Sequence, residues 1–236
     1  MLVLAIDTSS AAVTAAIVTV DDAVRTVAQR VTIDARAHGE LLAPSVDDCL
    51  AEAGAGPRDL DAIVAGVGPG PFTGLRVGLV TAAAMADALG IPAYGVCSLD
   101  AIAGSVDPTS IAGSVDPASI AGTVDAASLL VATDARRREV FWARYVDGAR
   151  VAGPAVARPA EVSTVDAVAM AGAGARLYAD VLGLPLLDAD HPDPAALVRV
   201  AAERVRGHAP SDPLTPLYLR RPDAVEPGAP KAVSQR

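Results

Sequence analysis

The first hundred residues alternate between short apolar runs and one helical pattern, which predicts a mixed α/β fold. Residues 2–6 form a continuous apolar run that ends in the polar sequence Asp7-Thr8-Ser9-Ser10, as expected of a buried strand followed by a turn. Residues 11–20 follow so closely that they favour a hairpin with the first strand. Further strands are expected at residues 24–33, 62–67 and 93–97.

Two helices are predicted between these strands. In the first, apolar residues recur every three or four positions, at Leu41, Leu42, Val46, Cys49, Leu50 and Ala53. Pro44 must then lie in the first turns of this helix or bend it. The second helix spans residues 79–89 after a glycine-rich loop, and Thr73 is its expected N-cap.

A nine-residue unit occurs three times in residues 102–128, starting at Ile102, Ile111 and Ile120. Three short units rich in Gly and Pro are too few for a solenoid with its own core. We expect a tandem duplication that lengthens a surface loop, since long loop insertions cost little free energy. The sequence assigns no function to this repeat.

The second half restarts as a strand, a basic turn and a strand. Strands are predicted at residues 129–133 and 140–146, and the turn between them contains Arg136, Arg137 and Arg138. This turn is either a solvated hairpin turn or a contact for an acidic partner or an RNA phosphate. A further strand is expected at residues 167–171, and helices at residues 173–182 and 194–207.

These elements divide the chain into two strand-led subdomains. The predicted boundaries are residues 1–100 for the first subdomain, 101–128 for the repeat loop, 129–221 for the second subdomain and 222–236 for a flexible tail.

Composition excludes several classes of protein. The chain of 236 residues is 52% hydrophobic, which is not typical of disorder, and only 3% aromatic. Its longest uncharged run, residues 62–75, is too short to span a bilayer, and the N-terminus has no basic segment of a secretory signal. Cys49 and Cys97 lie far apart in the sequence and are expected to be reduced core thiols. We therefore predict a cytoplasmic protein with no membrane contact.

The net charge of −9 argues against tight autonomous binding to nucleic acid, because such binding rests on paired phosphates.

Two stretches could carry nucleotide chemistry. Asp7, Thr8 and Ser9 place a carboxylate beside two hydroxyls at a strand end, where they could position a phosphate or hydrated Mg²⁺. The alternative is a turn that satisfies its own backbone. Gly68 and Gly70 precede a helix whose free N–H groups could bind an anion.

The glycine-rich stretch also has a second interpretation. Gly74 and Gly78 lie four residues apart and would let another helix approach closely.

A metal site is not predicted. His38 precedes a helical pattern, but a second ligand one turn later would fall on Leu42. The sequence contains no Gly-x-Ser-x-Gly nucleophile elbow and no supported Cys/His pair, so we expect no catalytic residue of these kinds.

Together these motifs resemble the TsaB (YeaZ) family, the accessory subunits of bacterial tRNA threonylcarbamoyladenosine synthesis. The similarity covers nearly the whole chain outside the repeat and the tail. It is carried by residues 4–10, His38 with residues 40–42, residues 66–78, residues 134–137 with Glu139 and Val140, and residues 216–221.

The resemblance implies an actin-like (ASKHA, ribonuclease H-like) fold of two subdomains with mixed sheets. It also implies a non-catalytic scaffold that pairs with a TsaD-type catalytic paralogue, which transfers the threonylcarbamoyl group to the adenosine beside the anticodon. A TsaE-type ATPase joins the assembly, and tRNA is reached only through the complex. This chain itself needs no cofactor, whereas ATP and Mg²⁺ could act in the assembled complex. A homodimer is expected when the partner is absent.

In this family the two helices of the first subdomain form the pairing surface. The resemblance places the following residues in it: His38, Leu41, Leu42, Val46, Cys49, Thr73, Gly74, Val77, Gly78 and Thr81. We expect Gly74 and Gly78 to serve close helix contact there rather than phosphate binding.

Two other functions remain open. One is an ASKHA-type ATP-binding phosphotransferase that uses Asp7 and the glycine-rich loop, with Asp134 as its sole candidate second acid. The other is a metallopeptidase, which is suggested only by an older family label. The catalytic paralogue has His-x-x-x-His where this chain has His38 and Leu42, so self-sufficient catalysis is not expected.

Overall fold

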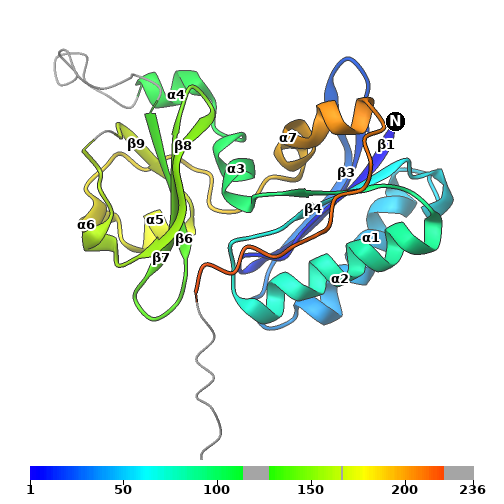
Figure 1. Ribbon diagram of the computed structural model, residues 1–236, viewed down its shortest axis with the longest axis horizontal. Helices are drawn as coiled ribbons and strands as arrows, with labels where there is room; N and C mark the ends of the chain where they lie inside the picture. Colours follow the sequence, from blue (N-terminus) through cyan, green and yellow to red (C-terminus); the bar gives the residue numbers. More distant parts are fainter. Residues whose placement is uncertain (114–127, 166, 221–236) are drawn as a thin grey trace, which may run out of the picture.

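The computed structural model describes residues 1–113, 128–165 and 167–220 (Figure 1). The first of its two β-sheets is centred on β1 (Leu2–Asp7). β1 pairs antiparallel with β2 and parallel with β4, so the strand order is β3-β2-β1-β4-β5. The bounds are β2 (Ala12–Val20), β3 (Val24–Ile33), β4 (Ala62–Gly66) and β5 (Ala93–Val96). All five strands expected in the first half are confirmed.

Helices cover both faces of this sheet (Figure 1). α1 (His38–Glu52) and α2 (Phe72–Leu89) lie on one face, and the 3-10 turn η1 (Pro57–Asp59) follows α1. Their apolar side chains join those of the strands in one core cluster. α7 (Pro194–Arg206) covers the opposite face through Leu197 and neighbouring residues. The predicted second subdomain contains α7, yet this helix packs on the first sheet.

The second sheet has the order β8-β7-β6-β9. Its strands are β6 (Ser128–Asp134), β7 (Val140–Val146), β8 (Ala149–Ala157) and β9 (Ala169–Ala171), and η2 (Pro159–Glu161) follows β8. The sequence analysis missed β8 because Gly153 and Pro154 interrupt its pattern, but an edge strand tolerates proline. The single helix expected over residues 173–182 is two, α5 (Ala173–Leu177) and α6 (Ala179–Leu182), with a break at Tyr178.

The nonapeptide repeat begins inside the core rather than in a surface loop. Ile102 lies in α3 (Ser98–Ala103) and Ile111 in α4 (Pro108–Gly113), and both are buried against the second sheet. Asp107 starts α4, because its carboxylate accepts a hydrogen bond from the Thr109 backbone N at 2.8 Å. The loop prediction is therefore wrong for residues 101–113, while residues 114–127 lie outside the described residues.

Residues 209–220 connect the two sheets at the C-terminal end. The backbone N–H of Asp212 donates to Ala93 at 2.9 Å and that of Leu217 donates to Val67 at 2.8 Å. The guanidinium of Arg220 then donates to the carbonyl of Ala135, beside the second sheet, at 3.1 Å. The segment thus crosses from the first sheet to the second (Figure 1). The predicted tail, residues 222–236, lies outside the described residues.

Among the described residues one helix, α2, is long and apolar enough by length and composition to cross a membrane. However, Gly74, Leu75 and Leu79 of this helix are buried within the protein. This is the arrangement of a helix that packs on a sheet in a layered α/β fold.

Candidate functional site

Asp7 ends β1 with only 1% of its surface exposed. One carboxylate oxygen accepts hydrogen bonds from the backbone N and the hydroxyl of Ser9, at 2.8 and 2.7 Å. The other accepts the hydroxyl of Ser98 at 2.6 Å. Burial raises the pKa of Asp7, and these hydrogen bonds oppose that rise. Both oxygens are therefore engaged inside the protein.

Thr8 fills the space left by two glycines of α2. Its hydroxyl donates to the carbonyl of Gly74 at 2.8 Å and accepts the backbone N–H of Gly78 at 3.0 Å. A Cβ on Gly78 would lie 2.5 Å from this hydroxyl oxygen. The two glycines thus allow α2 to approach β1 within the same chain. Their close contact is thus with Thr8 of the same chain, and the expectation that they also meet a second chain stays a prediction.

The loop before α2 is bound to the same region. Gly68 donates its N–H to the Ser98 hydroxyl at 3.2 Å, and a Cβ on Gly70 would overlap the carbonyl of Ser9. Residues 7–9 and the loop with Gly68 and Gly70 therefore lie close together, but their polar groups contact other groups of the same chain. This favours the turn interpretation of residues 7–9. Thr73 is not the N-cap as predicted, because α2 begins at Phe72 and Pro71 occupies the N-cap position.

Two histidines contact Ser10 from distant parts of the chain. His38 Nε2 lies 2.8 Å from the Ser10 carbonyl, and His191 Nδ1 lies 3.3 Å from the Ser10 hydroxyl. Burial lowers the pKa of His191. Within residues 1–113, 128–165 and 167–220, no three His, Cys, Asp or Glu side chains gather as metal ligands would. His38 is thus occupied as a helix-start contact to Ser10.

Both cysteines are buried and unpaired, as predicted. Burial raises the pKa of Cys97 to about 11, so its thiol stays protonated at neutral pH.

The residues predicted to meet a partner differ in exposure. The buried members are His38, Leu42, Val46, Cys49, Gly74 and Gly78. Leu41, Val77 and Thr81 are half-buried, and Thr73 is exposed. The buried side chains belong to the core between α1, α2 and the sheet, so they position the two helices. The other four residues have side-chain surface open to solvent.

The exposed face of α2 is centred on a residue that the sequence analysis missed. Val80 is 66% exposed, and Thr73, Val77 and Ala84 continue the same face at helical spacing. Arg76 and Asp87 are its charged residues, and Phe72 lies at its N-terminal end. The helical spacing of Val80 from Thr73 and Val77 could have indicated that Val80 lies on the same face. An apolar helix face of this kind is typical of an interaction surface.

Comparisons with known proteins connect this geometry to a family. A family model described as TsaD, tRNA N6-adenosine threonylcarbamoyltransferase, matches residues 32–181. The solved structure of YeaZ from Pseudomonas aeruginosa has a TM-score of 0.72 at 27% sequence identity, covering 92% of this chain and 99% of that chain. The chain belongs to the TsaB (YeaZ) family.

Other members of this family are similar over different lengths. An uncharacterised protein of Mycobacterium tuberculosis is 51% identical over 222 residues, which are 94% of this chain and 93% of that protein. The tRNA threonylcarbamoyladenosine biosynthesis protein TsaB of Bacillus subtilis is 34% identical over 105 residues, which are 44% of each chain. The likeness to YeaZ confirms the expected actin-like fold with two mixed sheets.

Proposed function

We propose that this chain is the non-catalytic scaffold subunit of a tRNA threonylcarbamoyltransferase complex. It binds a TsaD-type catalytic subunit, which transfers the threonylcarbamoyl group to the adenosine beside the anticodon. A TsaE-type ATPase joins the complex, tRNA is held mainly by the assembly, and the compartment is the cytoplasm. In the absence of the partner, the same surface forms a homodimer.

The observation that carries this proposal is the exposed face of α2. Val80 presents two thirds of its surface to solvent, yet α2 is fixed from behind by the contacts of Gly74 and Gly78 with Thr8. A rigid helix with an apolar exposed face can bind a partner with little loss of conformational entropy. Small side chains such as Ala84 let another helix come close to this face.

The state of Asp7 supports the absence of catalysis by this chain. A phosphotransferase needs a carboxylate that reaches the substrate or its metal ion, but the oxygens of Asp7 bind Ser9 and Ser98 inside the protein. We therefore propose no cofactor for the isolated chain. ATP and Mg²⁺ would act only in the assembled complex.

The partner surface is tested with Val80→Glu. A carboxylate at the centre of an apolar interface would be buried without a partner charge, so affinity for the TsaD-type subunit should fall at least about thirtyfold. Light scattering coupled to size-exclusion chromatography measures the assembly. The matched control is Val200→Glu on α7, because Val200 is 46% exposed but lies on the opposite side of the sheet.

Both variants should unfold in urea at the wild-type midpoint, since both positions are exposed. Assembly of Val80→Glu with wild-type affinity would overturn the proposed surface.

A further inference from the structure

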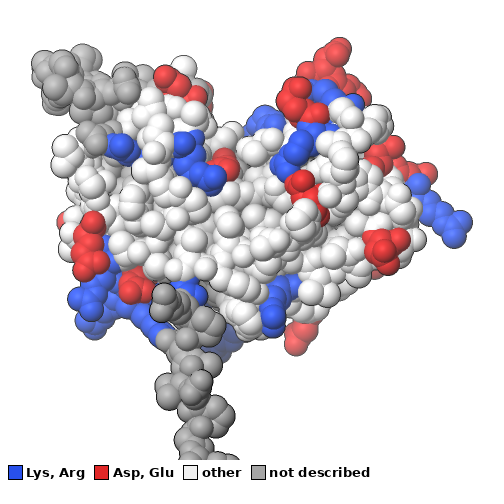
Figure 2. All heavy atoms as spheres, in the orientation of Figure 1, with Lys and Arg blue, Asp and Glu red and all other residues white. Residues whose placement is uncertain are grey.

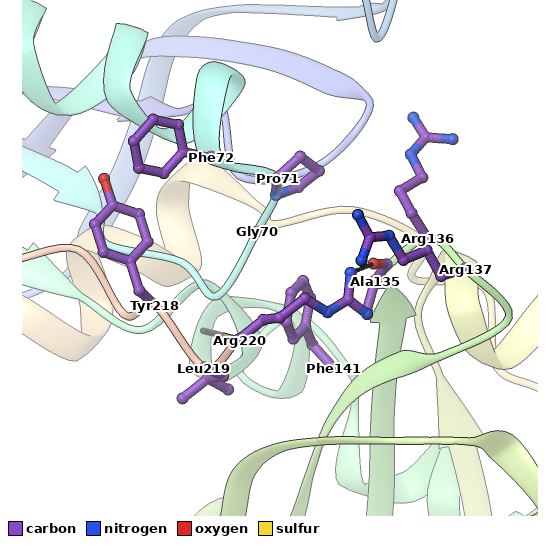
Figure 3. Close-up of a pocket in the computed structure, with 10 residues that line it drawn as sticks. All are labelled: Gly70, Pro71, Phe72, Ala135, Arg136, Arg137, Phe141, Tyr218, Leu219 and Arg220. Atoms are coloured by element: carbon purple, nitrogen blue, oxygen red, sulfur yellow. Dashed lines mark hydrogen bonds between the residues drawn. The ribbon is translucent and has the colours of Figure 1, made fainter. Parts of the chain in front are cut away.

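A hollow of about 720 Å³ lies between the start of α2, the β6–β7 turn and the end of the described chain (Figure 3). This volume is within the usual range for small-molecule sites. Three segments that are distant in sequence line it: residues 70–72, 135–137 and 218–220, together with Phe141. It adjoins the N-terminal end of the Val80 face at Phe72, but Val80 and Asp7 do not line it.

One side of the hollow is aromatic. The rings of Phe72 and Tyr218 lie 5.1 Å apart between centroids with an angle of 30° between their planes. The guanidinium of Arg76 lies 4.1 Å from the Phe72 ring centroid and donates to the Tyr218 hydroxyl at 3.2 Å. Both rings stay about half exposed, at 52% and 43%. They therefore offer a preformed surface on which a planar base can stack.

The other side is basic. Arg136 and Arg137 extend from the β6–β7 turn, and Arg220 faces the hollow from the C-terminal segment (Figure 3). Arg220 is held in place by the carbonyl of Ala135 and the carboxylate of Glu139. The side chain of Arg136 is 59% exposed, and its pair with Asp134 at 3.3 Å is an exposed one that contributes little.

The backbone of this turn is held in an unusual conformation. Arg136, Arg137 and Arg138 all have positive φ angles, of 62°, 57° and 61°. Residues other than glycine rarely adopt this conformation, and a run of three is costly. The turn thereby presents consecutive guanidinium groups beside one opening. Figure 2 shows basic side chains along the lower edge of the view, where the β6–β7 turn lies, although the chain as a whole is acidic.

We propose that this hollow binds one nucleotide unit, either from a single RNA strand or as a free nucleotide. The base stacks on the side formed by Phe72 and Tyr218, and the phosphate meets the guanidinium of Arg136. An aromatic surface opposite arginines is the combination that single-stranded nucleic-acid sites use. The proposal goes beyond the scaffold role, because it gives this chain a ligand of its own and does not depend on the partner.

The test measures binding to the isolated full-length chain. A fluorescently labelled oligoribonucleotide of about five residues is titrated by polarisation at several salt concentrations. Tyr218→Leu removes the stacking surface and should weaken binding at least about fivefold. Arg136→Asn removes one positive charge, and asparagine tolerates the positive φ angle at this position. This variant should reduce the slope of log affinity against log salt concentration by about 0.7.

The control is Arg58→Asn, at an exposed arginine in η1, which should bind like the wild type. AMP and inorganic phosphate serve as competitors to identify the source of the ligand. Displacement by AMP supports a free nucleotide, whereas binding of the oligoribonucleotide without such displacement supports an RNA strand. The proposal would be overturned if neither the oligoribonucleotide nor AMP bound at millimolar concentration. It would also be overturned if Tyr218→Leu and Arg136→Asn bound the oligoribonucleotide as the wild type does.

A negative result would not affect the proposed scaffold function. The scaffold is tested by Val80→Glu and the TsaD-type subunit, in an assay that needs no nucleotide. Arg136→Asn should assemble with that subunit as the wild type does.

Discussion

Gly66, Gly70 and Gly78 leave no room for a methyl group, and in each case the obstacle is part of residues 7–9. A Cβ on Gly66 would overlap the Asp7 carboxylate, and one on Gly70 would overlap the Ser9 carbonyl. The glycine-rich stretch is thus shaped at the residue scale by close contact with the end of β1. This accounts for its composition without a bound phosphate.

The role of Gly78 is tested by replacement with alanine. Gly78→Ala should lower the free energy of unfolding of the isolated chain by about 1 kcal/mol or more, because overlap with Thr8 exceeds the gain in helix propensity. Gly39→Ala in α1 is the matched control, since a Cβ there meets no atom within 4 Å. It should be neutral or stabilising by up to about 0.5 kcal/mol. Urea denaturation measures both variants. Unchanged stability of Gly78→Ala would contradict the close contact with Thr8.

The buried carboxyl of Asp7 predicts a pH dependence of stability. Because its pKa is raised in the folded chain, the native state holds the Asp7 proton more tightly than the unfolded state does. The contribution of this group is therefore fully present below its ordinary pKa of 3.8 and is lost as the pH rises through the raised value. Relative to Asp7→Asn, the wild type should lose stability from about pH 4 towards neutrality. A gain in the stability of the wild type relative to Asp7→Asn as the pH rises would contradict the assigned direction.

At the scale of elements, α2 and the repeat show two ways in which apolar residues are used. In α2, the buried face positions the helix, and the exposed face around Val80 is the surface that we propose for the partner. In the repeat, the isoleucine that starts each of the first two copies enters the core below the second sheet. The first part of the repeat is thus helical and contributes to the core, and it is not a surface loop.

This role of the repeat can be measured directly. Ile102→Ala and Ile111→Ala should each lower the free energy of unfolding by about 2–5 kcal/mol, the usual cost of a cavity at a buried isoleucine. Ser110→Ala, at an exposed position in α4, should change it by less than about 0.5 kcal/mol. Wild-type stability of both isoleucine variants would show that the repeat contributes no core.

The strands of the first half could be predicted because β1, β2 and β4 are continuous apolar runs bounded by turns. α4 could not, because a repeat rich in Gly and Pro favours a loop, although Asp and Pro also start helices. At the site, the sequence suggested only that Asp7 and the glycine-rich loop could act together on a nucleotide, and in the structure these residues lie side by side. The sequence could not show that Ser98, thirty-one residues beyond Val67 and in α3, takes one oxygen of Asp7.

The partner surface was predicted as helices α1 and α2, but periodicity alone could not orient them. Leu42 and Cys49 recur at apolar helical spacing because they face the sheet, so this pattern marks the inner face of α1. The exposed position of Val80 could be identified only from the structure, which shows the buried face of α2.

At the scale of the whole molecule, charge is distributed unevenly. The net charge is −9, and acidic side chains gather over the β2–β3 turn, whereas arginines gather near the β6–β7 turn (Figure 2). A long nucleic acid must approach an acidic body to reach this small basic region. We therefore expect the isolated chain to bind intact tRNA weakly, with an affinity that falls as salt rises. Tight binding that is insensitive to salt, measured by filter retention, would contradict this picture.

The most direct measurement of the central claim is transfer of a threonylcarbamoyl group to tRNA by the reconstituted subunits. With a threonylcarbamoyl donor supplied, we expect no transfer by this chain alone and transfer when the TsaD-type subunit and the ATPase are added. Val80→Glu should abolish that transfer, whereas Val200→Glu should not. Robust transfer by the isolated chain, or full activity of the complex with Val80→Glu, would contradict the proposed scaffold role.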